Sequence, residues 1–161
     1  MEAMPGALQA ILLDAGPLGM VSHPEAASRN AEVFEWFARL LEAGVIVEIP
    51  EISDYEVRRE LMRAGKSQSV ARLDELAAET YYRPLTTTAM RRAASLWARV
   101  RNEGMPTAPA EALDADVILA AQALEAAEDF ADEPGSTLVA TTNPRHLSRF
   151  VDAREWHEIA P

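Results

Sequence analysis

Short apolar runs alternate with stripes of apolar residues at helical spacing along this chain. The runs at 10–13 and 45–50 lack the polar alternation of a half-exposed strand, so they predict buried strands, the first of them covered on both faces. The run at 137–141 predicts the last clear strand. A weaker strand is predicted at 81–85 and a short edge strand at 156–159. Gly16-Pro17 directly after the first run predicts a turn there.

The helical stripes predict the segments between the strands. Apolar spacing predicts one helix across 33–41, ended by Gly44, and another across 90–100. Two more helices are predicted at 51–64 and 67–79, separated at Gly65, and a further one from near Asp114 to about Glu128. The segments 104–109 and 129–135 are expected to be loops.

Strands that alternate with helices indicate an α/β fold. We expect a three-layer α/β/α sandwich with a central, mostly parallel sheet, because right-handed crossovers place helices on both faces of such a sheet. Residues 1–161 are expected to form a single domain with its core at about 10–150, since the chain is long enough for one sizeable core. In such sheets the functional crevice lies beyond the carboxyl ends of the strands.

Acidic or polar side chains occur where predicted strands end and where predicted helices begin. Carboxylate and carbonyl oxygens are hard ligands that suit Mg²⁺ or Mn²⁺, and such metals mostly serve chemistry on phosphates. We therefore interpret these positions as a candidate metal site for a nuclease. The candidates are Asp14, Glu56, Asp114, Asp116 and Asn143, the last of which follows Thr141-Thr142.

Each candidate also has a purely structural explanation. Asp14 can form the turn before Gly16-Pro17, and Asn143 can cap a helix that begins at Pro144. Asp114 and Asp116 can start a helix, because acidic side chains favour its N-terminal end. Glu56 can belong to a surface ladder of ion pairs with its helical neighbours, or it can bind metal while two of those neighbours bind substrate phosphates. These neighbours are Arg59, Glu60 and Arg63.

The composition narrows the functional class. A net charge of −11 argues against a non-specific nucleic-acid binder, although it permits a nucleic-acid substrate and favours a basic protein partner. The absence of cysteine excludes disulfides and thiolate metal sites, so we expect a reducing cytoplasm. No apolar run approaches the roughly 18 residues of a membrane span, and no secretory signal is evident.

Other known motifs do not explain the acidic positions. Gly65-Lys66-Ser67 is similar to the end of a phosphate-binding loop, but Glu60 occupies the position of the first glycine and a helix precedes it. The three histidines lack the spacing of a zinc site. A haloacid-type phosphatase would need a second acid at the position of Gly16.

Four motifs taken together resemble the PIN domain, and most closely the VapC-like toxins of bacterial toxin–antitoxin pairs. They span about Ile11 to Phe150. The motifs are Leu12-Leu13-Asp14, the helix segment from Glu51 to Leu61 that contains Glu56, Asp116-Val117-Ile118-Leu119-Ala120-Ala121-Gln122-Ala123, and Val139-Ala140-Thr141-Thr142-Asn143-Pro144-Arg145-His146-Leu147.

The resemblance implies a Mg²⁺- or Mn²⁺-dependent endoribonuclease. It implies metal binding by Asp14, Glu56 and Asp116, and it places Asp114 and Asn143 among the catalytic residues. Thr141 fits the hydroxyl residue that steadies the first aspartate. His146 stands where some relatives carry a further acid, which leaves a second metal ion open.

The resemblance further implies a homodimer and an antitoxin partner, here with a basic arm that suits the acidic surface. Two alternatives stay open: a catalytically weak PIN-like module that binds a protein, and a metal-dependent phosphatase that cleaves small phosphate esters.

Overall fold

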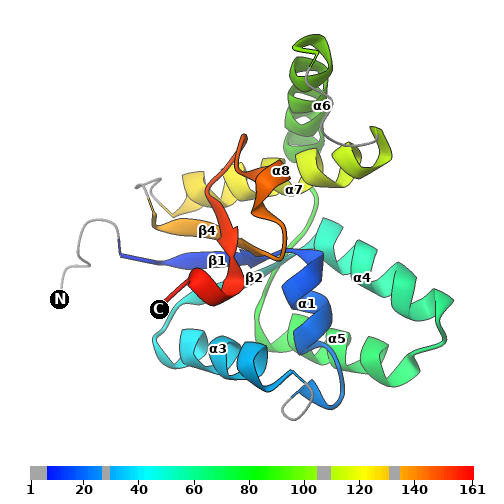
Figure 1. Ribbon diagram of the computed structural model, residues 1–161, viewed down its shortest axis with the longest axis vertical. Coiled ribbons are helices and arrows are strands. Elements are labelled where there is room, and N and C mark those ends of the chain that lie inside the picture. Colours follow the sequence, from blue (N-terminus) through cyan, green and yellow to red (C-terminus); the bar gives the residue numbers. More distant parts are fainter. Residues whose placement is uncertain (1–6, 27–29, 105–109, 131–134) are drawn as a thin grey trace.

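A five-stranded sheet forms the centre of the fold, and every strand pair in it is parallel (Figure 1). The computed structural model describes residues 7–26, 30–104, 110–130 and 135–161. The strand order is β3-β2-β1-β4-β5. The strands are β1 Ala10–Leu13, β2 Ile46–Pro50, β3 Tyr81–Arg83, β4 Thr137–Thr141 and β5 Ala153–Glu155.

Helices cover both faces of the sheet, which confirms the predicted α/β/α fold (Figure 1). Ile11 and Leu13 of β1 pack among α1, α3 and α5 on one face, whereas Leu12 packs against α7 and α8 on the other. Successive side chains of a strand point to opposite faces, so a strand covered on both faces must be apolar throughout. The helices are α1 Ala15–Val21, α3 Ala31–Glu42, α4 Glu51–Arg63, α5 Ser67–Glu79, α6 Thr87–Asn102, α7 Ala110–Asp129 and α8 Pro144–Leu147.

Helix α6 projects away from the sheet and packs along the N-terminal half of α7 (Figure 1). The contact is a separate apolar cluster in which Ala93 and Val100 of α6 meet Leu113 and Val117 of α7. Small residues on α6 allow the two helices to approach closely. Among the described residues, no helix combines the length and the apolar character that a membrane crossing requires.

Three of the predicted boundaries are wrong. Helix α1 begins directly after Asp14 instead of a turn, because Pro17 falls in the first helical turn, where a missing N–H is tolerated. Helix α7 begins at Ala110 rather than near Asp114, so neither Asp114 nor Asp116 is its N-cap. The edge strand ends at Glu155, and the segment Trp156–Glu158 forms a 3₁₀ helix, η1.

The other predicted elements are present. Gly44 and Gly65 follow α3 and α4 with φ angles of 76° and 67°, the left-handed conformation that ends helices at glycine. The loops predicted at 104–109 and 129–135 lie mostly outside the described residues.

Candidate metal and active site

Asp14 lies where β1 ends and α1 begins, and both of its carboxylate oxygens are held. Oδ1 accepts a hydrogen bond of 2.7 Å from the N–H of Ala15, and Oδ2 accepts one of 2.7 Å from the hydroxyl of Thr141. Leu13 pairs with Ala140 in the sheet, so Asp14 and Thr141 are the next residues in register on neighbouring strands. Asp14 therefore caps helix α1, in place of the turn that its structural explanation gave it, and is also fixed at the carboxyl edge of the sheet.

Thr141 connects Asp14 to the loop before α8. Its side chain is fully buried, and its hydroxyl oxygen accepts a hydrogen bond of 3.0 Å from the N–H of Asn143. Asn143 occupies the N-cap position of α8, but its exposed side chain makes no capping hydrogen bond. The Asn143 amide is thus at the rim of the site and open to solvent.

Glu56 on α4 and Asp116 on α7 lie within electrostatic reach of Asp14. Burial, the charge of Asp14 and the charge of Asp116 raise the pKa of Glu56 to about 7, against the opposing charge of Arg59. Burial and the charge of Asp14 likewise raise the pKa of Asp116 to about 6, against His146 and Arg149. Three elements far apart in the sequence therefore bring these carboxylates together.

Arginine and histidine side chains flank the three acids. Arg59 lies beside Glu56 and stacks on Tyr55, with 5.0 Å from its guanidinium carbon to the ring centroid. Arg149 lies beside Asp116, and its Nε donates a hydrogen bond of 3.2 Å to the carbonyl of His146. Sequence reasoning did not single out Arg149. The available signal was three basic residues, Arg145, His146 and Arg149, shortly after the last strand.

Asp114 and Arg63 do not belong to the group of three acids and flanking basic residues. Asp114 is exposed and lines a pocket between α6 and α7, because residues two apart on a helix face different sides and Asp116 faces the sheet edge. The exposed Arg63 forms an ion pair with Glu60 on the same helix. This pair is one rung of the surface ladder considered for α4.

The donor set fits a hard divalent cation. Three carboxylates from separate elements meet in a partly buried place, and two of them have raised pKa values, so a cation there would relieve both repulsion and desolvation. Their oxygens do not form a set lying within 4.8 Å of one another. Within the described residues, such a set consists of Glu155, His157 and Glu158, mostly exposed at η1.

A groove of about 450 Å³ lies between α1 and α4 beside Glu56. Gly16 in this groove also lies against the loop after β4, since a Cβ at this position would come within 2.7 Å of the Thr142 hydroxyl. Glycine therefore allows α1 to approach the loop that follows β4. The groove is lined by Ala15, Gly16, Gly19, Glu56, Val57, Arg59, Glu60 and Leu61.

Comparison with solved structures confirms the PIN-like fold. The chain is similar to a chain of VapBC2 from Rickettsia felis bound to a DNA fragment from their promoter, at a TM-score of 0.62 and 16% identity, covering 92% of this chain and 99% of that one. A chain of DNA-bound VapBC from Salmonella typhimurium gives 0.59 and 18%, covering 93% and 99%. A chain of FitAcB from Neisseria gonorrhoeae gives 0.60 and 20%, covering 92% and 99%.

No protein-family model matches the sequence, and no curated protein matches it either. At the identities of the solved structures, the likeness shows the fold alone.

Proposed function

We propose that this protein is a Mg²⁺- or Mn²⁺-dependent endoribonuclease that hydrolyses phosphodiester bonds in RNA. The observation that carries the proposal is the mutual electrostatic effect of Asp14, Glu56 and Asp116 at one edge of the sheet. Carboxylates that repel one another in a partly buried place suit a bound divalent cation. The resemblance of the four sequence motifs to the PIN domain supports the same assignment.

Each residue has a distinct part in this proposal. Asp14, Glu56 and Asp116 would hold the ion, and Thr141 keeps Asp14 in a single orientation. When bound, the ion supplies a lowered pKa for water and charge stabilisation at the phosphate. The raised pKa of Glu56 belongs to the metal-free site, so Glu56 would release its proton when the ion binds. A carboxylate oxygen that the ion leaves free could then accept the proton of the attacking water.

Exposed residues around the acids would contact the RNA. Arg59 lines the groove beside Glu56 and can bind a substrate phosphate. Asn143 is exposed and stays in the proposal as a catalytic residue at the rim. Asp114 lines the pocket between α6 and α7 and has no part in the proposal. Arg63 would have to exchange its ion pair with Glu60 for a phosphate, and an exposed pair of this kind is weak.

We further propose that the protein is the toxin of a toxin–antitoxin pair. Its fold is that of chains in VapBC and FitAcB structures, and its motifs resemble those of VapC-like toxins. A net charge of −11 would suit an antitoxin with a basic arm. A homodimer that acts in the cytoplasm completes this proposal.

The direct test is to incubate the purified protein with total cellular RNA and map the cleavage sites. We expect discrete sites that need Mg²⁺ or Mn²⁺ and vanish with EDTA. The variant Asp116→Asn should leave the RNA intact at the same protein concentration. Cleavage that persists in Asp116→Asn would point to a contaminating nuclease or a different site and would contradict the proposal.

A catalytically weak module that binds a protein partner is the second candidate. Two observations favour it: His146 replaces the further acid of some relatives, and the three carboxylates do not lie within 4.8 Å of one another. RNA that stays intact with Mn²⁺ present would favour this candidate. Cleavage of small phosphate esters alone would instead favour a phosphatase.

A further inference from the structure

Helix α4 begins without a cap from its own segment. It follows β2 directly, and its N-cap residue is Pro50, whose side chain has no hydrogen-bond acceptor. The first N–H groups of a helix have no partner within the helix and need one from elsewhere. The N–H of Ile52 finds this partner on another helix, since it donates to Oε1 of Gln122 on α7 at 3.3 Å.

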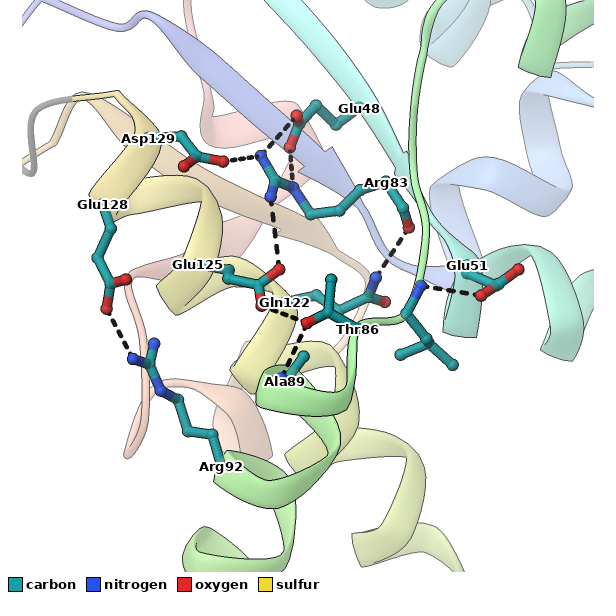
Figure 2. Close-up of polar contacts among 11 residues, drawn as sticks. Glu48, Glu51, Arg83, Thr86, Ala89, Arg92, Gln122, Glu125, Glu128 and Asp129 are labelled. Atoms are coloured by element: carbon teal, nitrogen blue, oxygen red, sulfur yellow. Dashed lines mark hydrogen bonds and ion pairs between the residues drawn. The ribbon is translucent and has the colours of Figure 1, made fainter.

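The Gln122 amide is used at both ends and is fully buried. Its Nε2 donates a hydrogen bond of 2.8 Å to the carbonyl of Arg83 at the end of β3 (Figure 2). A buried amide that lost either partner would leave an unsatisfied polar group, which is costly. One side chain therefore connects α7, the start of α4 and the edge of the sheet.

Neighbouring contacts hold the same face of α7. Gln122, Glu125 and Asp129 follow one another at helical spacing, and all three meet Arg83 (Figure 2). The Arg83 guanidinium also makes two hydrogen bonds of 2.9 Å to the buried Glu48 of β2. These contacts fix the C-terminal half of α7 against β2 and β3, so the connection through Gln122 is made to a rigid support.

The two connected helices carry two of the three candidate metal ligands. Glu56 lies one turn after Ile52 on α4, and Asp116 lies six residues before Gln122 on α7. Helices are rigid over such lengths, so the distance between Ile52 and Gln122 sets the distance between the two carboxylates. Loss of a group that hydrogen-bonds to a metal ligand commonly weakens metal affinity about 10- to 100-fold. A residue that acts on two ligands through their helices is expected to fall at the lower end of this range.

We propose that Gln122 is a positioning residue that sets the spacing of Glu56 and Asp116. The inference rests on the proposed metal site and adds a residue outside it. Gln122 contacts neither carboxylate and acts only through the two helices. Its removal should therefore alter metal affinity more than an equal loss of stability elsewhere would.

The first test measures Mn²⁺ affinity by calorimetry in Gln122→Met and Gln122→Leu. Both variants remove the two hydrogen bonds and put an apolar side chain of similar size in the place of glutamine. Two variants are used so that the test still works if one of them does not fold. Leu76→Val is the control, because Leu76 is a core residue of α5, which carries no candidate ligand. At a temperature where all are folded, we expect about tenfold weaker binding in the Gln122 variants and unchanged binding in the control.

The second test measures the helix spacing without metal. The chain has no cysteine, so spin labels at Met62→Cys on α4 and Glu128→Cys on α7 are unique, and both positions are exposed. We expect a shifted or broader distance distribution when Gln122 is replaced, and the original distribution with Leu76→Val. An unchanged distribution, or unchanged Mn²⁺ affinity, would overturn the inference.

The two tests separate this inference from the proposed function. If the wild-type protein bound no Mn²⁺, the metal site itself would be wrong. The spin-label distances would then still decide whether Gln122 sets the spacing of α4 and α7.

Discussion

The hydroxyl of Thr141 donates a hydrogen bond of 2.7 Å to Oδ2 of Asp14 and thereby joins the ends of two neighbouring strands. Because the same oxygen accepts from the N–H of Asn143, one buried hydroxyl holds both the first carboxylate and the loop before α8. Together with the bond from the N–H of Ala15, the bond from Thr141 holds the Asp14 carboxylate in one orientation, within electrostatic reach of Glu56 and Asp116.

Replacing Thr141 by valine should therefore weaken the metal site. Thr141→Val keeps the shape of the side chain but removes the hydroxyl from both hydrogen bonds, so we expect Mn²⁺ affinity to fall about tenfold and the free energy of unfolding to fall by about 1–3 kcal/mol. Calorimetric titration and chemical denaturation measure the two effects.

Thr137 on the same strand provides a matched control. Its hydroxyl is buried and has no hydrogen-bond partner in the described part of the chain. Thr137→Val should therefore leave Mn²⁺ affinity unchanged and keep or raise stability, because it removes an unsatisfied polar group. Equal losses of affinity in both variants would contradict the role given to Thr141.

Asp14→Asn should stabilise the metal-free protein and abolish activity. Asparagine can still accept the hydrogen bond from the N–H of Ala15, so the cap of α1 is retained. Its Nδ2 cannot accept from the Thr141 hydroxyl but can donate to the oxygen of that hydroxyl instead. The substitution removes a negative charge that acts on both Glu56 and Asp116. Thermal unfolding in EDTA tests the first part and RNA cleavage the second; a lower melting temperature would show that Asp14 is mainly structural.

The stability of the metal-free protein should fall as the pH rises from about 4 to 7. In the folded state, the pKa of Glu56 is raised from 4.5 to about 7 and that of Asp116 from 3.8 to about 6. The folded state thus binds more protons than the unfolded state in this range, and the stability contributed by these protonated acids is lost as they ionise.

Melting temperatures measured across this range in EDTA test the pH effect. Other acids are held in ion pairs, and their contribution to stability rises with pH. Glu60 is one of them, since Arg63 lowers the pKa of Glu60. The double variant Glu56→Gln with Asp116→Asn supplies the reference. The wild type should lose more stability with rising pH than the double variant, and identical slopes would refute the assignment.

Gly16→Ala should destabilise the protein, whereas Gly19→Ala should not. A Cβ at Gly16 would lie within 2.7 Å of the Thr142 hydroxyl, while one at Gly19 meets nothing within 4 Å. We expect a loss of about 1–3 kcal/mol for Gly16→Ala and a gain of up to about 1 kcal/mol for Gly19→Ala on the same helix. Chemical denaturation measures both.

A second substitution identifies the cause of the Gly16 effect. Thr142→Ala removes the hydroxyl and the methyl group, the two Thr142 groups that a Cβ at Gly16 would approach most closely, so it should restore most of the stability lost in Gly16→Ala. If the double variant were no more stable than Gly16→Ala alone, the close approach would not be the reason for glycine at this position.

The sequence was sufficient to predict the sheet and the position of Asp14 at its carboxyl edge. Asp14 ends a strand that is apolar at every position, and a parallel topology brings the carboxyl ends of such strands to one edge. Glu56 and Asp116 were included through the resemblance of their motifs to the PIN domain. The position of Asp14 follows from the sheet topology, and the pattern of apolar residues predicts that topology.

Features that depend on helix boundaries and on distant contacts were out of reach. Asp114 and Asp116 lie inside α7, which begins at Ala110, so Asp114 faces α6 while Asp116 faces the sheet edge. Pro109 directly before this start is a local signal for it, but a proline also suits the loop predicted at 104–109. Helix α1 was missed because Gly16-Pro17 is typical of turns. Gln122 and Arg149 contact or influence residues that are more than thirty positions away in the sequence. The periodicity of apolar residues does not reveal such distant partners.

The central claim is that Asp14, Glu56 and Asp116 share one divalent cation, and thermal unfolding with and without Mn²⁺ tests it most directly. Since a ligand that binds only the folded state stabilises it, millimolar Mn²⁺ should raise the melting temperature of the wild type. Asp116→Asn should abolish this rise, whereas Asp114→Asn, on the other side of α7, should retain it. A wild-type melting temperature that does not respond to Mn²⁺ or Mg²⁺ would contradict the account.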